Sequence, residues 1–408
     1  MRSNRSQVFY HWNPLLERVD RKIPFGELYC SVALQIDRLV PGYLVYYYGP
    51  EKTKKIVEKR KTSPEQVLSQ IRTLADLVDE EEKIRREFLH KEIVAMETVV
   101  RKVLGEEFSY RDEVRKLYDI EPTRISEKEI DNVKNELCDL LGSSDIRKSL
   151  QTWRLSKRAT FDQIRTAIGF LKHEYSTRTS KILIMPKEEE CAFNLVRNRP
   201  WGGYNWYCGS YRSRVEINLD KPVSLLSLPA LVAHESYPGH HAEGCIKERF
   251  LFHERGLLET SADIMNSPQR VISNSIANIA LDLIYEDRRL IYEQLGKLLG
   301  IEVTGKDLQV SRLLERLEHT RKNAALMMYD EGKTRKEALD YLVEVGLQDA
   351  RSAEVELRFI TKKIWRTHIF CYFDMTDIMR KMLPKIRNQA MKLYVTEFCP
   401  SQIDQVFS

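Results

Sequence analysis

The sequence is poor in the residues that interrupt regular structure: its 408 residues include 17 glycines and 14 prolines. Long helices are therefore permitted over most of the chain. It has seven cysteines, an odd number without a C-x-x-C pair, which favours reduced thiols over a disulfide framework. It also lacks an apolar run as long as a signal peptide or a membrane helix. We therefore predict a cytoplasmic protein with no membrane partner.

The chain also lacks a strong excess of charge of either sign. Its 65 basic and 60 acidic residues are interspersed and leave a formal net charge of +5, which is typical of a solvated surface. Five basic residues lie near the start, at Arg2, Arg5, Arg18, Arg21 and Lys22, but no nucleic-acid-binding motif accompanies them. We therefore predict no nucleic-acid partner. A steep salt-dependent affinity for DNA or RNA would revive that alternative.

Helical periodicity fills the first part of the chain. Apolar residues recur on one face over residues 63–103 and predict a helix pair or one long helix. A helix start at Ser126 predicts another helix, which ends at Gly142. We therefore predict an N-terminal helical module over residues 1–178, without chemistry of its own, and a second region over residues 179–408. The boundary is approximate, and one continuous unit is the alternative.

The pattern changes after this module. The aromatic and glycine-rich stretch over residues 199–214 predicts a loop over a surface or cleft. Residues 214–220 alternate between apolar and polar side chains, which predicts a half-buried strand, with an edge position as one option. A helix with Ser227 as its cap is expected to follow, and helical periodicity returns from residue 254 to the end.

The stretch HESYPGHH, residues 234–241, holds three histidines and a glutamate in eight positions. In the H-E-x-x-H motif of zinc hydrolases, two histidines one turn apart on a helix bind one ion. Here the corresponding position is Pro238, and neither following histidine has the right placement on an ideal helix. A helix break at Tyr237, Pro238 and Gly239 would absorb the two extra residues, because proline disrupts the turn and glycine adopts dihedrals that other residues avoid.

This stretch predicts a zinc site. His234 and either His240 or His241 are candidate metal ligands, and Glu235 is the candidate general base that takes a proton from the metal-bound water. Surface histidines at the end of a polar helix are the alternative. The combination with a Pro-Gly break and a preceding strand favours the metal site.

A third ligand is expected from a following element. Glu259 lies 25 residues after His234, and Asp263 is one helical turn further on the same face. This spacing predicts Glu259 as a ligand and Asp263 as a carboxylate that orients one imidazole from outside the ligand shell. Glu243, Glu248 and Glu254 lie among basic residues and are predicted to form a solvated face.

The motif resembles the H-E-x-x-P-G-H-H signature of the bacterial and archaeal family known as domain of unknown function 885, which belongs to the glutamate-zincin branch of the zincin-like metallopeptidases. The resemblance covers roughly residues 200–385 and includes the segments GKTRKEALDYLVEVGL, AEVELRFI and CYFDM. It implies the same ligands, with Glu235 as the base and Glu259 as the third ligand. At Glu259 this chain reads ETSA where the family has E-G-W-A.

The resemblance and the residues together predict a mainly α fold: a zincin-like catalytic core with a small β-sheet beside the active-site helix. The predicted function is a zinc-dependent peptidase, with carboxypeptidase action as one option, Tyr372 as a catalytic donor and Arg321 and Arg366 as substrate-binding residues. A hydrolase of a small amide and a catalytically degenerate binding protein of the same fold are the alternatives.

Overall fold

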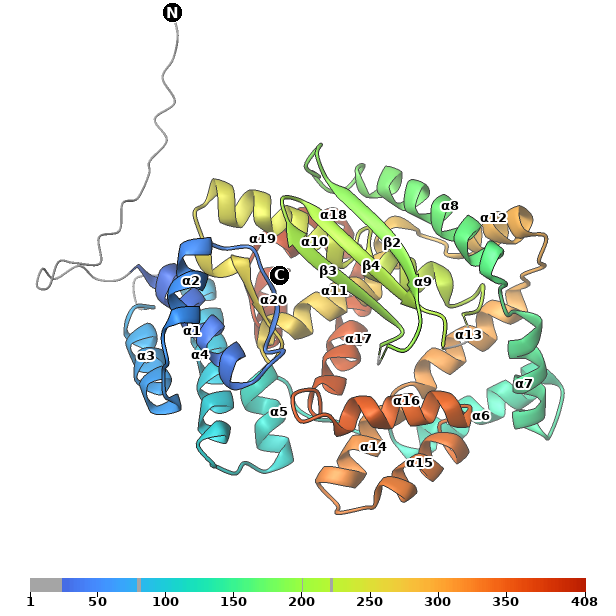
Figure 1. Cartoon of the computed structure of the whole chain (residues 1–408). Helices are drawn as coiled ribbons and strands as arrows, with labels where there is room; N and C mark the ends of the chain where they lie inside the picture. Colours follow the sequence, from blue (N-terminus) through green and yellow to red (C-terminus); the bar gives the residue numbers. More distant parts are fainter. Residues whose placement is uncertain (1–23, 79–81, 200, 221–222) are drawn as a thin grey trace, which may run out of the picture.

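The computed structural model describes residues 24–78, 82–199, 201–220 and 223–408, and over these residues the chain is mainly helical with two small sheets (Figure 1). This confirms the predicted fold class of a mainly α protein with a small β-sheet. The basic residues from Arg2 to Lys22 lie outside the described residues.

The first helices lie together at one end of the molecule (Figure 1). Residues 63–103 form a helix pair, which is one of the two predicted options. The first helix of the pair starts at a capping box between Ser63 and Gln66 and buries Val67 and Ile71. The elements here are α1 (Phe25–Leu39), β1 (Leu44–Tyr47), α2 (Glu51–Lys59), α3 (Pro64–Asp76), α4 (Lys83–Val103) and α5 (Tyr110–Tyr118).

Three more helices lead to the main sheet. Ser126 accepts a hydrogen bond from the Glu129 amide and starts α6, which ends at the left-handed Gly142 as predicted. The helices are α6 (Glu127–Leu141), α7 (Ile146–Ser156) and α8 (Phe161–Thr179), and the strands are β2 (Glu190–Val196), β3 (Gly203–Gly209) and β4 (Arg212–Asn218).

The three-stranded sheet has the order β2-β4-β3, with β4 parallel to β2 and antiparallel to β3. Val215 and Ile217 are fully buried, as their alternation predicts, but Glu216 and Asn218 are buried as well, so the prediction of a half-buried strand is wrong. The option of an edge position for residues 214–220 is wrong, because β4 has a partner on both sides. The loop predicted over residues 199–214 is also wrong for most of its length, since Tyr204, Trp206 and Tyr207 lie in β3.

A second, two-stranded sheet pairs β1 with β5 (Ala262–Ile264) in antiparallel orientation. The predicted N-terminal helical module therefore also contains a strand, β1, whose Tyr46 lines the candidate site described below. The signal was present in PGYLVYYYGP, where a run of apolar and aromatic residues stands between two turn-forming pairs.

The rest of the chain is helical. The elements are α9 (Leu228–Glu235), α10 (His240–Ile246), a π-helix (Lys247–Glu254), a 3-10 helix (Leu258–Ser261), α11 (Pro268–Ile284), α12 (Arg289–Leu299), α13 (Gly305–Leu317), α14 (Thr320–Tyr329), α15 (Arg335–Glu344), α16 (Ala350–Thr361), a 3-10 helix (His368–Tyr372), α17 (Asp374–Lys381), α18 (Leu383–Asn388), α19 (Ala390–Val395), a 3-10 helix (Pro400–Gln402) and α20 (Ile403–Val406). No helix within the described ranges combines the length and apolar character needed to cross a membrane.

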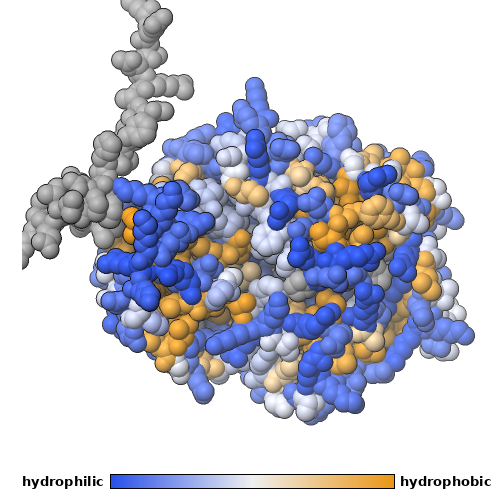
Figure 2. Space-filling view, in the orientation of Figure 1, coloured by the Kyte–Doolittle hydropathy of each residue, from blue (hydrophilic) through white to orange (hydrophobic). Residues whose placement is uncertain are grey.

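Side chains from both sides of residue 178 share the core. The largest apolar cluster runs from α1 to α20, and a second joins α8 to β4, α9, α11 and α12. Residues 1–178 therefore do not bury a core separate from residues 179–408 in the described part of the chain. On the face shown in Figure 2, hydrophilic side chains separate the apolar patches, as the interspersed charges predict.

Candidate metal centre

The HESYPGHH stretch forms the end of one helix and the start of the next. α9 ends at Glu235 and α10 begins at His240, so the predicted helix break is present. In the break, the Tyr237–Pro238 peptide bond is cis, and the Gly239 amide donates to the Ala233 carbonyl over 3.1 Å. A β-carbon at position 239 would lie 2.0 Å from the carbonyl oxygen of His234, so only glycine fits this approach.

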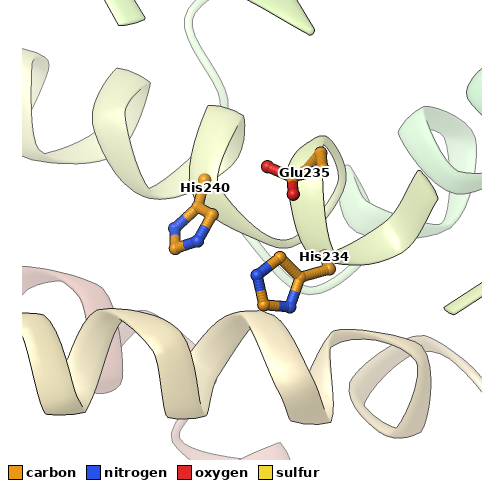
Figure 3. Close-up of side chains that lie close together, drawn as sticks. All are labelled: His234, Glu235 and His240. Atoms are coloured by element: carbon orange, nitrogen blue, oxygen red, sulfur yellow. The ribbon is translucent and has the colours of Figure 1, made fainter. Parts of the chain in front are cut away.

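The break brings His234, Glu235 and His240 together (Figure 3). One ligand atom from each residue lies within 4.8 Å of the others, and the two imidazole centroids are 4.8 Å apart. The sequence predicts these three side chains as two metal ligands and the general base. Between the two open alternatives for the second histidine, the structure places His240 beside His234.

Hydrogen bonds fix the tautomer of each histidine. His234 Nδ1 lies 3.0 Å from Asn278 Oδ1, and the Asn278 amide nitrogen donates to the Tyr372 carbonyl, so Oδ1 is the acceptor and Nδ1 carries the proton. Ser273 donates its hydroxyl proton to Glu243 over 2.5 Å and therefore accepts from His240 Nδ1 at 3.2 Å. Both rings consequently keep the lone pair of Nε2 for a ligand.

The protonation states suit a metal site. Burial lowers the pKa of His234 to about 3, and burial also lowers the pKa of His240, although the neighbouring Glu243 opposes that shift. Both imidazoles are therefore neutral near pH 7, the form that binds metals. Burial raises the pKa of Glu235 to about 8, against the positive charge of Arg270. A carboxyl group in this range can both accept and release a proton near neutral pH.

The three residues line a cavity of about 90 Å³. β3 forms one wall: the Asn205 amide donates to the Glu235 carbonyl over 2.7 Å, and a β-carbon at Gly203 would lie 2.9 Å from Glu235 Oε1. Tyr372 lines the cavity, as its predicted catalytic role requires. The other lining residues are Val45, Tyr46, Gly203, Tyr204, Asn205, Glu243, Asp263, Met265, Arg270, Ser273, Asn274 and His368.

The alternative ligand His241 does not face this cavity. Its ring is fully buried on the other side of the break, with Nε2 2.7 Å from Glu189 Oε2 and Nδ1 2.8 Å from Ser213 Oγ. Both ring nitrogens are engaged there. The prediction of His241 as a ligand is therefore corrected, because consecutive residues at a helix start point in directions about 100° apart.

The predicted third ligand, Glu259, also lies elsewhere. It is buried, forms an ion pair with Arg85 and lines a neighbouring cavity. The prediction assumed an α-helix that carries Glu259 and Asp263 on one face. The structure instead places Glu259 in a 3-10 helix and Asp263 in β5, which removes that geometry.

Asp263 does line the same cavity as His234 and His240, but its carboxylate pairs with Arg270 instead of an imidazole. The role predicted for it belongs to Asn278 and Ser273, which sequence reasoning missed. Both lie on α11 with Arg270, on a helix that is otherwise largely buried and apolar. A polar stripe at three- to four-residue spacing in SPQRVISNSIANIALDLI was the available signal.

The predicted solvated face is correct for Glu254 and wrong for the other two glutamates. Glu243 is buried and accepts from Lys247 Nζ at 2.7 Å, and Glu248 is buried and accepts from the amides of Ser210 and Tyr211. Both glutamates face inward, because α10 packs against β3 and α11 and Glu248 of the π-helix accepts a hydrogen bond from the Tyr207 hydroxyl of β3.

The two predicted substrate-binding arginines are also corrected. Arg321 pairs with Glu356 and Glu318, and Arg366 pairs with Glu113 and lies over the Tyr110 ring. Neither is among the described residues that line the metal cavity. Both guanidinium groups are held by interhelical carboxylates.

Comparison with known proteins adds a likeness of fold. No family model and no curated protein matches the sequence. A solved structure described as a "putative lipoprotein" from Colwellia psychrerythraea superposes with a TM-score of 0.50 at 14% identity, over 88% of this chain and 69% of that one. Another, a "putative lipoprotein of unknown function" from Shewanella oneidensis, gives a TM-score of 0.49 at 11% identity, over 93% and 82%.

At this identity the first comparison shows that the chain shares its fold with that protein. The predicted cytoplasmic location is contradicted by this first comparison, because the Colwellia psychrerythraea structure is described as a "putative lipoprotein". The composition argument failed here because the absence of an apolar run in a sequence does not determine where a protein works.

Proposed function

We propose that the protein is a zinc-dependent metallopeptidase in which His234 and His240 hold the metal and Glu235 transfers the proton. The observation that carries the proposal is the convergence of two neutral imidazoles, each with Nε2 free, and a buried carboxyl group in one cavity. The resemblance of HESYPGHH to the H-E-x-x-P-G-H-H signature supports the same chemistry.

Each residue of the proposed site then has a defined role. Zinc in this position would supply an acidified water and a positive charge for the substrate carbonyl. Glu235 accepts the proton of the attacking water and delivers it to the leaving amine. Asn278 and Ser273 hold the two imidazoles in place from outside the ligand shell. Tyr372 is the predicted donor to the developing oxyanion.

An extended substrate would pair with β3. β3 bonds to β4 along one edge only, and its residues Gly203, Tyr204 and Asn205 line the cavity. Free strand edges bind peptides through main-chain hydrogen bonds, which would place a peptide carbonyl beside Glu235.

A catalytically degenerate binding protein is the second candidate, and the position of Glu259 favours it. Zinc hydrolases usually have three protein ligands besides the water. Among the described residues, only His234, Glu235 and His240 form such a group, while Glu259 pairs with Arg85. Glu243, Asp263 and His368 line the same cavity and carry further potential donor atoms.

Metal analysis tests the proposal. Protein purified without chelator or tag metal should contain about one zinc per chain, and His234→Ala and His240→Ala should each lose it. Glu259→Gln should keep it, since Glu259 lies outside the cluster. Glu235→Gln should keep zinc but lose hydrolysis of a peptide library.

The outcomes separate the candidates. Zinc binding by the parent without turnover of any peptide or small amide would favour the binding protein. No zinc binding at neutral pH would exclude the metallopeptidase. Full hydrolysis by Glu235→Gln with metal bound would show that another group takes the proton.

A further inference from the structure

Arg270 is the only lysine or arginine among the described residues that line the metal cavity. It lies in the first turn of α11 and is 7% exposed. Its Nη2 side faces Asp263, while Nε has no hydrogen-bond partner among the described residues. A buried guanidinium donor without an acceptor is costly, so this side of the group is suited to an anionic ligand.

Among the described residues, Asp263 is the ion-pair partner of Arg270. Of the other cations nearby, Lys247 pairs with Glu243 and Arg85 pairs with Glu259 and Glu397. Arg270 lines the same cavity as His234, Glu235 and His240. A ligand bound to Arg270 would therefore lie next to the proposed catalytic residues.

The geometry points to Arg270 as the residue that binds the free C-terminal carboxylate of the substrate, so that the enzyme removes residues from C-termini. This inference rests on the proposed metallopeptidase function and names its substrate class. A guanidinium binds a carboxylate through two parallel N–H donors. The ion pair with Asp263 fixes the orientation of the other side of the Arg270 guanidinium. Val45 and Met265 form an apolar part of the cavity wall.

A carboxylate could also come from an acidic side chain, so the test must separate the two sources. Three acetylated tripeptides serve as probes: acetyl-Ala-Ala-Leu with a free carboxylate, the same peptide as its C-terminal amide, and the amide of acetyl-Ala-Ala-Glu. Their binding to zinc-loaded Glu235→Gln protein is measured by isothermal titration calorimetry. This variant lacks the proton-transfer group, so affinity is measured without turnover.

The free carboxylate should bind at least about tenfold more tightly than either amide, as expected for a charge-assisted pair. Adding Arg270→Gln should abolish this preference. Adding Arg212→Gln, an exposed arginine at the start of β4, should leave it unchanged. Because Arg270→Gln leaves Asp263 buried without its partner, the double change Asp263→Asn with Arg270→Gln serves as a charge-balanced second variant.

Several results would overturn the inference: a preference that survives both Arg270 variants, equal binding of the free acid and its amide, equally tight binding of the Glu amide, or no binding of any probe. Parent enzyme that hydrolyses the acid and the amide equally would refute the inference and keep the metallopeptidase. An Arg270-dependent preference without turnover by the parent would refute the metallopeptidase and keep a carboxylate site.

Discussion

The substitution Gly239→Ala tests the idea that the helix break builds the metal site. In the structure, an alanine β-carbon at this position would lie 2.0 Å from the His234 carbonyl oxygen and 2.4 Å from that of Ala233. Real β-carbons essentially never approach another atom within 3.0 Å, so the chain must retreat by about 1 Å, the difference between 3.0 and 2.0 Å. The retreat moves His240 relative to His234, because Gly239 directly precedes His240.

Gly239→Ala should lower both the unfolding free energy and the affinity for zinc. Forced overpacking of this kind costs about 1–3 kcal/mol of unfolding free energy. Metal–ligand distances tolerate deviations of only about 0.2 Å, so a displacement of about 1 Å should remove most of the zinc affinity. Zinc content after dialysis and urea unfolding of the metal-free protein measure the two effects separately.

Gly169→Ala is the matched control. Gly169 lies on the exposed side of α8, and a β-carbon there would meet no atom within 4 Å. Alanine should therefore raise the unfolding free energy by about 0.5–1 kcal/mol and leave zinc content unchanged. The reasoning would be refuted if Gly239→Ala bound one zinc with parent affinity and kept the parent's stability.

Three further predictions concern single side chains. Asn278→Ala removes the hydrogen bond that orients His234 and should weaken zinc binding by about 10–100-fold in a competition assay with a chelator; unchanged affinity would exclude an orienting role. His241→Ala should lower the unfolding free energy by about 2–3 kcal/mol, because Glu189 and Ser213 lose their buried partner, yet the folded variant should keep its zinc; loss of zinc with parent stability would reverse the assignment of His240 and His241. Burial raises the pKa of Glu92 from 4.5 to about 7, so the folded state holds this proton more tightly: the stabilisation is present below pH 4.5, is lost as pH rises through 7, and amounts to roughly 3 kcal/mol. Glu92→Gln should remove this part of the pH dependence in urea titrations at pH 5 and pH 8, and an unchanged difference between the two would contradict it.

Features set by neighbours in the sequence were predictable. The Ser126 cap depends on an amide three residues away, the buried face of β4 depends on simple alternation, and the break depends on the Pro-Gly pair. Each of these follows from local backbone chemistry. The mainly α fold and the meeting of His234 with one of the two following histidines were accessible for the same reason.

Partners that are distant in sequence were not predictable. Asn278 comes 44 residues after the His234 that it orients, and Arg85 comes 174 residues before the Glu259 that it holds. Sequence periodicity does not predict such pairings, because tertiary packing determines which buried charged groups lie next to each other. The expected roles of Arg321 and Arg366 failed in the same way, since their partners lie on other helices.

The local chemistry around Glu259 explains why the ligand expected there is absent. Thr260 donates its hydroxyl to the Leu257 carbonyl over 2.7 Å, and Ser261 donates to the Leu258 carbonyl over 2.6 Å. Bonds from hydroxyls to carbonyls three residues back support the tight 3-10 turn in place of an α-helix. The turn directs Glu259 toward Arg85 and away from the histidines. Breaking such a buried ion pair costs about 3–5 kcal/mol, so a metal that recruited Glu259 would bind more weakly by that amount. The ETSA segment therefore favours a metal site formed by His234, His240 and a third ligand other than Glu259.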